Sequence, residues 1–220
     1  HAKAAARVQG PLTAALDPWQ VLRPLLDAGG YLPWTEGALA PAALVELANE
    51  IVFADRTEVV ELGSGVSTIV LSRLLRERGG RLTSLEHDAD WARVVGSQLE
   101  REGLAEIARL IQAPLEPHPR ALGGAPWYAP VALDTLPASG IDLLLVDGPP
   151  GYGEGMALSR YPALPVLAER LAPGALVALD DAERDGEGDI LARWERELPE
   201  WRFGPRTGTG MAVGARHPNG

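Results

Sequence analysis

Apolar and polar positions change their spacing along the chain, and the change predicts an ordered alternation of strands and helices. Short, mostly apolar runs predict strands at residues 58–62, 81–86, 107–111, 141–146 and 175–179. Apolar positions three or four residues apart predict helices at residues 41–51, 67–78, 89–102, 162–171 and 189–198. Because strands that alternate with helices form a parallel sheet with helices on both faces, we expect an α/β fold.

The segments outside this alternation have a different character. Residues 1–56 combine a short helix and a loop with the helix from residue 41, and we expect an N-terminal helical segment there. It would pack on a main domain of residues 57–220, so that the chain forms a single globular unit. The proline-rich residues 114–137 predict a long loop, and residues 201–214 predict a terminal hairpin.

Composition narrows the possible functions of this chain. The formal net charge of -10 disfavours nucleic acids and anionic membranes as partners. The absence of cysteine excludes disulfides, thiolate zinc sites and a cysteine nucleophile. No apolar run approaches the roughly 20 residues of a membrane span, and we expect a cytoplasmic location. The single lysine, Lys3, excludes an oxidoreductase that uses a Ser-Tyr-Lys constellation.

The turns after the predicted strands carry the candidate chemistry, because ligands of parallel sheets bind beyond the carboxyl ends of the strands. In the first turn, Gly63 would permit a sharp bend and Gly65 would let a ligand approach the backbone. Glu86 ends the next strand, 23 positions after Gly63. An acidic residue about 20 positions on binds ribose hydroxyls in nucleotide-binding α/β folds. The alternative is a solvated residue at the end of a strand.

Three aspartates follow two of the later strands. Asp147 could bind a metal, hold a cationic group or act as a base, or it could be a turn residue ahead of Gly148. Asp180 and Asp181 end the next strand. Three carboxylates at one edge need a cation, a proton or an arginine, and their oxygens suit Mg²⁺. Alternatively, Asp181 caps the following segment or Arg184 neutralises the group.

Four segments in this order resemble class I S-adenosylmethionine-dependent methyltransferases, most closely the branch of methyltransferase family 24 and the catechol O-methyltransferase-like enzymes. The segments are ELGSGVST at residues 61–68, LTSLE at 82–86, VDGPPG at 146–151 and LDDAER at 179–184. The resemblance implies a Rossmann-like, mostly parallel sheet of seven strands with an antiparallel hairpin at the C-terminus. It also implies S-adenosylmethionine as the cofactor.

The expected cofactor-binding residues lie in the first three of these segments and directly after the second, where His87 could flank the adenine or could simply be an exposed histidine. They are Glu61, Gly63, Ser64, Gly65, Ser67, Thr68, Glu86, His87 and Asp147. The resemblance places Asp147, Asp180 and Asp181 at the Mg²⁺ ligand positions of the metal-dependent relatives, which usually carry Asn where this chain has Asp181. No lysine base lies between Gly148 and Met156.

The expected function is methyl transfer to a small-molecule acceptor, as an O-methylation with or without Mg²⁺. Asp147 or His118 would be the base. The candidate acceptor-binding residues are Trp34, Trp127, Tyr128, Tyr152, Arg160 and Arg184. For the aromatic residues of the loop, core packing is the alternative. A metal-independent enzyme that acts on a protein or another acceptor, a non-catalytic protein that binds S-adenosylmethionine, and a homodimer all stay open.

Overall fold

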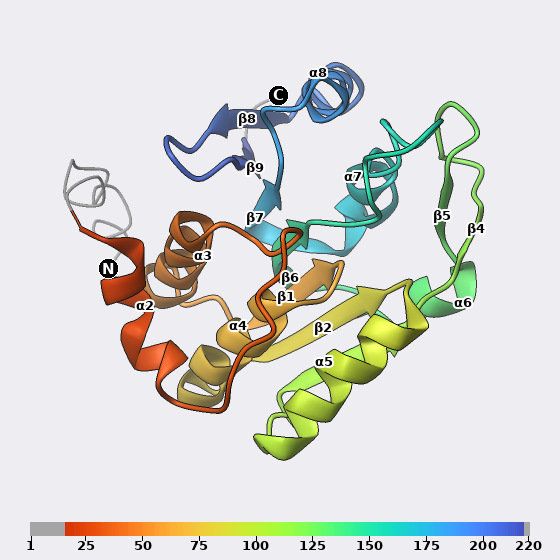
Figure 1. The fold of residues 1–220 in the computed structure, drawn as a ribbon. Coiled ribbons are helices and arrows are strands. Elements are labelled where there is room, and N and C mark those ends of the chain that lie inside the picture. Colours follow the sequence, from red (N-terminus) through yellow and green to blue (C-terminus); the bar gives the residue numbers. More distant parts are fainter. Residues whose placement is uncertain (1–15, 218–220) are drawn as a thin grey trace.

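The computed structural model describes residues 16–217 and contains a sheet of seven strands (Figure 1). The strands are β1 (Glu58–Leu62), β2 (Arg81–Glu86), β3 (Ala108–Gln112), β6 (Ile141–Val146), β7 (Leu171–Leu179), β8 (Trp201–Pro205) and β9 (Ala212–Arg216). Their order is β3-β2-β1-β6-β7-β9-β8. All neighbours are parallel except β9, which pairs antiparallel with both β7 and β8. This topology confirms the predicted α/β class and the C-terminal hairpin.

The helices cover both faces of the sheet. One face carries α2 (Pro18–Leu26), α3 (Pro41–Phe53), α4 (Val66–Arg78) and α5 (Ala89–Arg101). The other carries α6 (Pro130–Leu133), α7 (Ala163–Leu167), the 3₁₀ helix η1 (Ala168–Arg170) and α8 (Asp185–Glu197). Among residues 16–217, none of the helices combines the length and the apolar character needed to span a bilayer.

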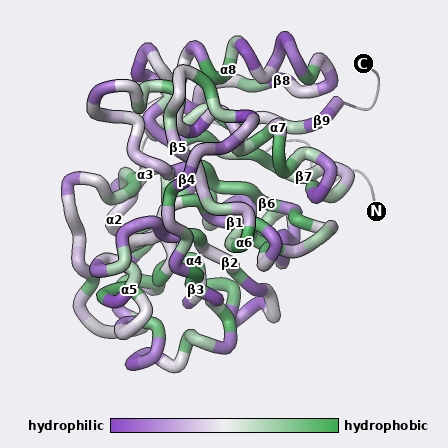
Figure 2. Tube along the Cα trace, turned by 90° about the vertical axis from the view of Figure 1, so that its right-hand side faces the viewer, coloured by the Kyte–Doolittle hydropathy of each residue, from purple (hydrophilic) through white to green (hydrophobic). Residues whose placement is uncertain are grey.

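Alternating residues of the strands supply the two halves of the core. Val59 packs with the helices of the first face and Val60 with those of the second, as the period of two in a strand requires. Hydrophobic strands consequently run through the middle of the molecule (Figure 2). Each fully buried leucine or valine contributes roughly 1.5–3 kcal/mol to folding.

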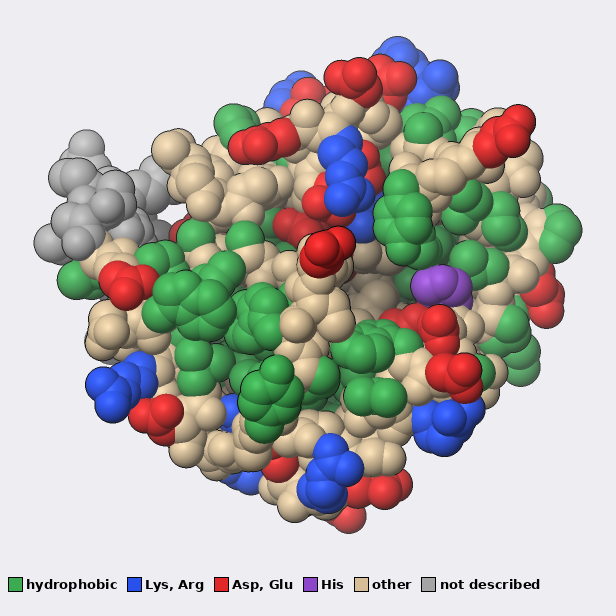
Figure 3. Space-filling model, viewed as in Figure 1, with side chains coloured by type: hydrophobic (Ala, Val, Ile, Leu, Met, Phe, Trp, Pro, Cys, Tyr) green, Lys and Arg blue, Asp and Glu red, His purple; other side chains and the backbone are tan. Residues whose placement is uncertain are grey.

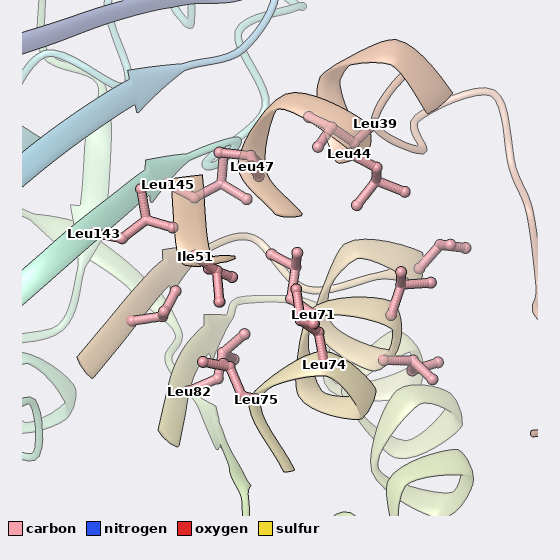
Figure 4. Packing of buried hydrophobic residues seen from close by; sticks show 14 of the residues in the cluster. Leu39, Leu44, Leu47, Ile51, Leu71, Leu74, Leu75, Leu82, Leu143 and Leu145 are labelled. Atoms are coloured by element: carbon pink, nitrogen blue, oxygen red, sulfur yellow. The ribbon is translucent and has the colours of Figure 1, made fainter. Parts of the chain in front are cut away.

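The N-terminal segment shares the core of the sheet. Leu44, Leu47 and Ile51 of α3 belong to the same hydrophobic cluster as Leu143 and Leu145 of β6, and Figure 4 shows Leu47 beside Leu145. The predicted boundary at residues 56/57 therefore falls between α3 and β1, which belong to the same hydrophobic cluster. As a domain boundary it stays a prediction.

The prediction of a long loop at residues 114–137 was wrong. This segment contains an antiparallel pair, β4 (Leu115–Pro117) and β5 (Pro126–Tyr128), followed by α6. Trp127 and Tyr128 have no exposed surface, and their packing on the second face of the sheet orders a segment that its prolines alone describe as irregular. Tertiary burial outweighed local propensity here.

Candidate active site

A cavity of about 290 Å³ lies at the carboxyl ends of β1, β2, β6 and β7. Figure 3 looks onto this edge and shows a hollow near the middle of the face, with acidic and basic side chains at its border. Ten of the predicted site residues line it: Gly63, Ser64, Glu86, His87, Asp147, Tyr152, Arg160, Asp180, Asp181 and Arg184. Gly65 and Ser67 line an adjoining hollow of about 40 Å³, which shares Ser64 and Asp147 with the cavity.

Two glycines shape the turn between β1 and α4. Gly63 has a φ of 91°, and a Cβ there would lie 3.1 Å from the carbonyl carbon of Asp147. Only glycine lets β1 and β6 end so close together. At Gly65 an added Cβ would meet no atom of the described residues within 4 Å, so this position faces open space. Trp91 of α5 holds the turn by donating its indole N–H to the carbonyl of Ser64, at 2.9 Å.

Glu86 projects from the end of β2 as an ionised acceptor. It accepts hydrogen bonds from the backbone N–H and the hydroxyl of Ser64, at 2.9 and 2.8 Å, and from the N–H of Asp88, at 2.8 Å. His87 Nδ1 lies 3.0 Å from its carboxylate. Burial raises the pKa of Glu86, but these hydrogen bonds outweigh burial and lower the pKa below its ordinary value. Asp88 caps α5 and so fixes the direction in which the chain leaves the site.

Glu61 lies behind the turn and does not line the cavity. Its carboxylate accepts hydrogen bonds from the hydroxyls of Ser67 and Thr68, each at 2.5 Å, and Thr68 in turn accepts one from the N–H of Gly65. Burial raises the pKa of Glu61 to about 7. Glu61 and Thr68 therefore brace the glycine turn from the core side, a role that differs from the expected direct contact with the cofactor.

The three predicted aspartates converge at the ends of β6 and β7. Asp147, Asp180 and Asp181 offer oxygens that all lie within 4.8 Å of one another. Burial raises the pKa of Asp147 well above its usual range, and the neighbouring Asp180 raises it further. Burial, followed by the charge of Asp181, raises the pKa of Asp180 to about 6. Carboxyl groups at this separation compete for one proton or one cation.

Two arginines meet this cluster. The buried guanidinium of Arg160 lies 3.1 Å from Asp181 Oδ2 and 3.5 Å from Asp147 Oδ1. The half-exposed Arg184 lies 2.7 Å from the same Asp181 oxygen. In the described residues, no ion pair reaches the carboxylate of Asp180. The alternative that Arg184 neutralises the group therefore holds for one of the three aspartates.

Four other candidates do not line the cavity. Trp127 and Tyr128 are fully buried, and Trp34 packs against Trp19 with ring centroids 4.9 Å apart. His118 packs edge-on against Trp127 at 5.0 Å, and its Nδ1 accepts a hydrogen bond from the N–H of Arg120. Burial lowers the pKa of His118. This placement favours the alternative of aromatic packing and offers His118 no contact with the site.

Sequence reasoning missed part of the cavity wall. Thr35, Glu36, Gly37, Ala38 and Trp91 also line it. Trp91 could have been found from its place one turn into the helix after Glu86. The segment around Gly37 carries no comparable signal, because it is an irregular stretch far from the motifs.

Residues 60–182 match the family model of a methyltransferase domain, methyltransferase family 24. The match spans more than half of the chain, and the chain belongs to this family. With the sheet order described above, it is a class I methyltransferase that depends on S-adenosylmethionine. No curated protein matches the chain.

Solved structures share the fold over most of their length. The SAH-bound methyltransferase PaMTH1 of Podospora anserina has a TM-score of 0.62 at 15% identity, covering 90% of this chain and 86% of its own. A putative O-methyltransferase from Klebsiella pneumoniae has a TM-score of 0.62 at 23% identity, with 94% of each chain covered. The O-methyltransferase from Bacillus cereus in complex with SAH has a TM-score of 0.59 at 17% identity, covering 97% and 94%.

Proposed function

We propose that this enzyme transfers the methyl group of S-adenosylmethionine to a hydroxyl oxygen of a small molecule. One observation carries the proposal: an open glycine turn, an ionised Glu86 and a cluster of three aspartates border a single cavity. The similar structures named as O-methyltransferases support the same reaction class.

The residues of the β1 and β2 ends fit the nucleoside part of the cofactor. Glu86 is ionised and can accept hydrogen bonds from both ribose hydroxyls. His87 and Trp91 border the same part of the cavity and would flank the adenine. Gly65 and Ser67 border the smaller hollow, where open space in front of the turn leaves room for the methionine part. Asp147 lies between the two hollows, next to the reacting methyl in this proposal.

The β6 and β7 ends would align the acceptor. In an in-line displacement the enzyme's contribution is to hold the acceptor oxygen against the methyl group and to exclude water. The side chain of Asp147 is 15% exposed at the cavity, and its raised pKa makes its carboxylate a stronger base toward the proton of the acceptor hydroxyl. Tyr152, which is 74% exposed, and Arg184 stand at the rim and would contact the rest of the acceptor.

The aspartate cluster also fits a divalent cation. The oxygens of Asp147, Asp180 and Asp181 are close enough to share one ion, and the carboxylate of Asp180 has no ion pair within residues 16–217. Such an ion would lower the pKa of an acceptor hydroxyl. The ion pairs of Arg160 and Arg184 favour the metal-independent alternative, because they already balance part of the charge. Activity that is lost in chelator and restored by Mg²⁺ supports the metal-assisted form, and activity indifferent to chelator supports the alternative.

Calorimetry with S-adenosylhomocysteine tests the cofactor site. We expect Glu86→Gln to weaken binding about 10- to 100-fold, because the neutral amide accepts fewer hydrogen bonds than the carboxylate it replaces. Glu58→Gln is the matched control, since Glu58 begins β1 at the opposite edge of the sheet and should leave affinity unchanged. Equal affinities of wild type and Glu86→Gln would remove the ribose contact from the proposal.

Turnover separates an enzyme from a protein that only binds the cofactor. Formation of S-adenosylhomocysteine should depend on a hydroxylated small acceptor and should fall at least about 100-fold in Asp147→Asn. If wild type and Asp147→Asn methylated protein substrates at equal rates, the proposed class of small-molecule acceptors would be contradicted. Sedimentation equilibrium tests the separate prediction of a homodimer.

A further inference from the structure

Arg160 is a buried guanidinium with an unusual set of partners. Its Nε donates to the carbonyl of Pro149 at 3.1 Å, its Nη2 to the carbonyl of Asp147 at 2.8 Å and its Nη1 to the carbonyl of Asp180 at 3.1 Å. These carbonyls belong to the turns that follow β6 and β7. One side chain from a separate segment therefore ties together the two strand ends that carry the aspartates.

The same guanidinium sits among more carboxyl groups than it can pair with. Besides Asp147 and Asp181, the buried carboxylate of Glu187 lies 3.6 Å from Arg160 Nη1. Asp180 adds a fourth carboxyl group to this cluster, although within the described residues no ion pair reaches it. Its fork is held by backbone carbonyls, so the positive charge cannot swing out to solvent as that of a surface arginine does.

These contacts leave Arg160 little capacity to hold an acceptor. The three carbonyls and two carboxylates engage all three nitrogens of the guanidinium, and the side chain is only 4% exposed. The expected role in binding the acceptor is therefore not supported by its contacts. A cation bound by Asp147 and Asp181 would, however, lie close to the positive charge of Arg160.

We propose that Arg160 is the internal counter-ion of the aspartate cluster, a positioning residue that fixes the ends of β6 and β7 without a metal and weakens the binding of a divalent cation. This inference rests on the cation site of the proposed function. A fixed positive charge within a few ångströms of two ligands repels an incoming divalent ion. Charge balance by Arg160 also avoids leaving several carboxylates buried together when the ion is absent.

Binding of Mn²⁺ to the full chain, followed by electron paramagnetic resonance, tests this role. Arg160→Gln should bind Mn²⁺ at least about tenfold more tightly than wild type, while its thermal midpoint without metal falls. Arg160→Lys keeps a charge on a flexible stem without the fork, and should bind Mn²⁺ about threefold more tightly. A purely structural arginine would lower stability and leave Mn²⁺ affinity unchanged or reduced.

Two other arginines serve as controls. Arg73→Gln removes a guanidinium that is equally buried but contacts other residues, and should lower the thermal midpoint with no change in Mn²⁺ affinity. Arg184→Gln removes a half-exposed charge and should tighten Mn²⁺ binding by at most about two- to threefold.

The proposal is overturned if neither Arg160 variant binds Mn²⁺ more tightly than wild type. Arg160→Lys decides the question if Arg160→Gln does not fold. Calorimetry with S-adenosylhomocysteine on the same preparations keeps the two proposals apart. If the Arg160 variants bind S-adenosylhomocysteine normally but show no gain in Mn²⁺ affinity, only the role of Arg160 is contradicted. If wild type does not bind S-adenosylhomocysteine, the proposed function is contradicted.

Discussion

Arg73 and Arg160 are both buried arginines, yet their surroundings differ in charge. Arg73 donates to both oxygens of Glu102, at 2.7 and 2.6 Å, and to the carbonyls of Leu25, Leu26 and Gly30. One positive charge thus meets one negative charge, and every remaining donor meets a backbone carbonyl. The pair joins α4 to the end of α5, to the last turn of α2 and to the loop after it.

Arg160 also donates to three backbone carbonyls, but it faces an excess of carboxylates at the edge of a cavity. The difference separates a polar contact that completes the fold from one that prepares a site. Natural chains depart from local charge balance mainly where function requires it, and perturbed pKa values gather at the same places. Substitutions at the balanced pair should lower stability and leave ligand affinity unchanged. Substitutions at the cavity edge should change ligand affinity independently of stability.

The largest effect is expected at the balanced pair. Arg73→Gln leaves the nearly buried Glu102 without its cation and should lower the free energy of unfolding by about 3–5 kcal/mol. Urea unfolding measures this loss. The affinity for S-adenosylhomocysteine of the folded fraction should stay unchanged.

The exposed pair of Arg23 and Asp27 is the control for that substitution. Both side chains are mostly exposed, so Arg23→Gln should change stability by less than about 0.5 kcal/mol. A similar loss in both variants would show that burial does not distinguish the two ion pairs.

The second effect concerns Glu61, a buried carboxylate that has no ion pair within the described part of the chain. Its pKa is raised from 4.5 to about 7, so folding favours the protonated form. The stability that this preference contributes is present below pH 4.5 and is lost as the pH rises through about 7. As the pH rises from 4.5 to about 7, the free energy of unfolding of Glu61→Gln should therefore rise relative to that of wild type by on the order of 3 kcal/mol.

Urea unfolding at several pH values measures that difference. The other titrating groups are common to both proteins, so the pH dependence of the difference reports Glu61. A constant difference between the two proteins from acid to alkaline pH would contradict the raised pKa.

The smallest effects compare the two glycines of the turn. Gly63→Ala should cost about 1–3 kcal/mol, because φ is 91° and the added methyl meets the backbone of Asp147. Gly65→Ala should change stability by less than about 0.5 kcal/mol, since its Cβ would enter open space. That methyl should nevertheless weaken binding of S-adenosylhomocysteine. For the two variants, scanning calorimetry measures the stability and titration calorimetry measures the affinity.

Gly140→Ala separates backbone strain from contact in this comparison. Gly140 also has a positive φ, 84°, but an added Cβ would meet no described atom within 4 Å. It should therefore cost less than Gly63→Ala. Unchanged cofactor affinity in Gly65→Ala would argue against a ligand in front of the turn.

The order of elements could be predicted because each strand and helix carries its own period of apolar residues. Boundaries were less accurate where tertiary contacts decide them. The strand β7 begins at Leu171 and not at residue 175, because Leu171 pairs with Ile141 across an irregularity in the ladder. The helix α8 begins at Asp185, before its first apolar position.

The site was predictable to the extent that it lies on strand ends. Residues directly after a strand, such as Glu86 and Asp147, have a position set by the sheet, and the topology brings them together. That argument does not say to which side a residue within a strand points. The contacts of Glu61 behind the turn could therefore not be predicted. Nor could spacing reveal that Arg160, on an irregular segment, reaches back to two strand ends.

Ala38 borders both the cavity and the adjoining smaller hollow, and with Gly210 it also borders a further hollow of about 310 Å³ beside Asp180 and Asp181. Neither residue falls within positions 60–182, where the chain is recognisably like its family. The matched range therefore contains Glu86, Asp147, Asp180 and Asp181, whereas part of the wall of these hollows comes from residues outside it. Larger side chains at Ala38 and Gly210 would accordingly narrow the space at this end of the molecule without changing any residue of the matched range.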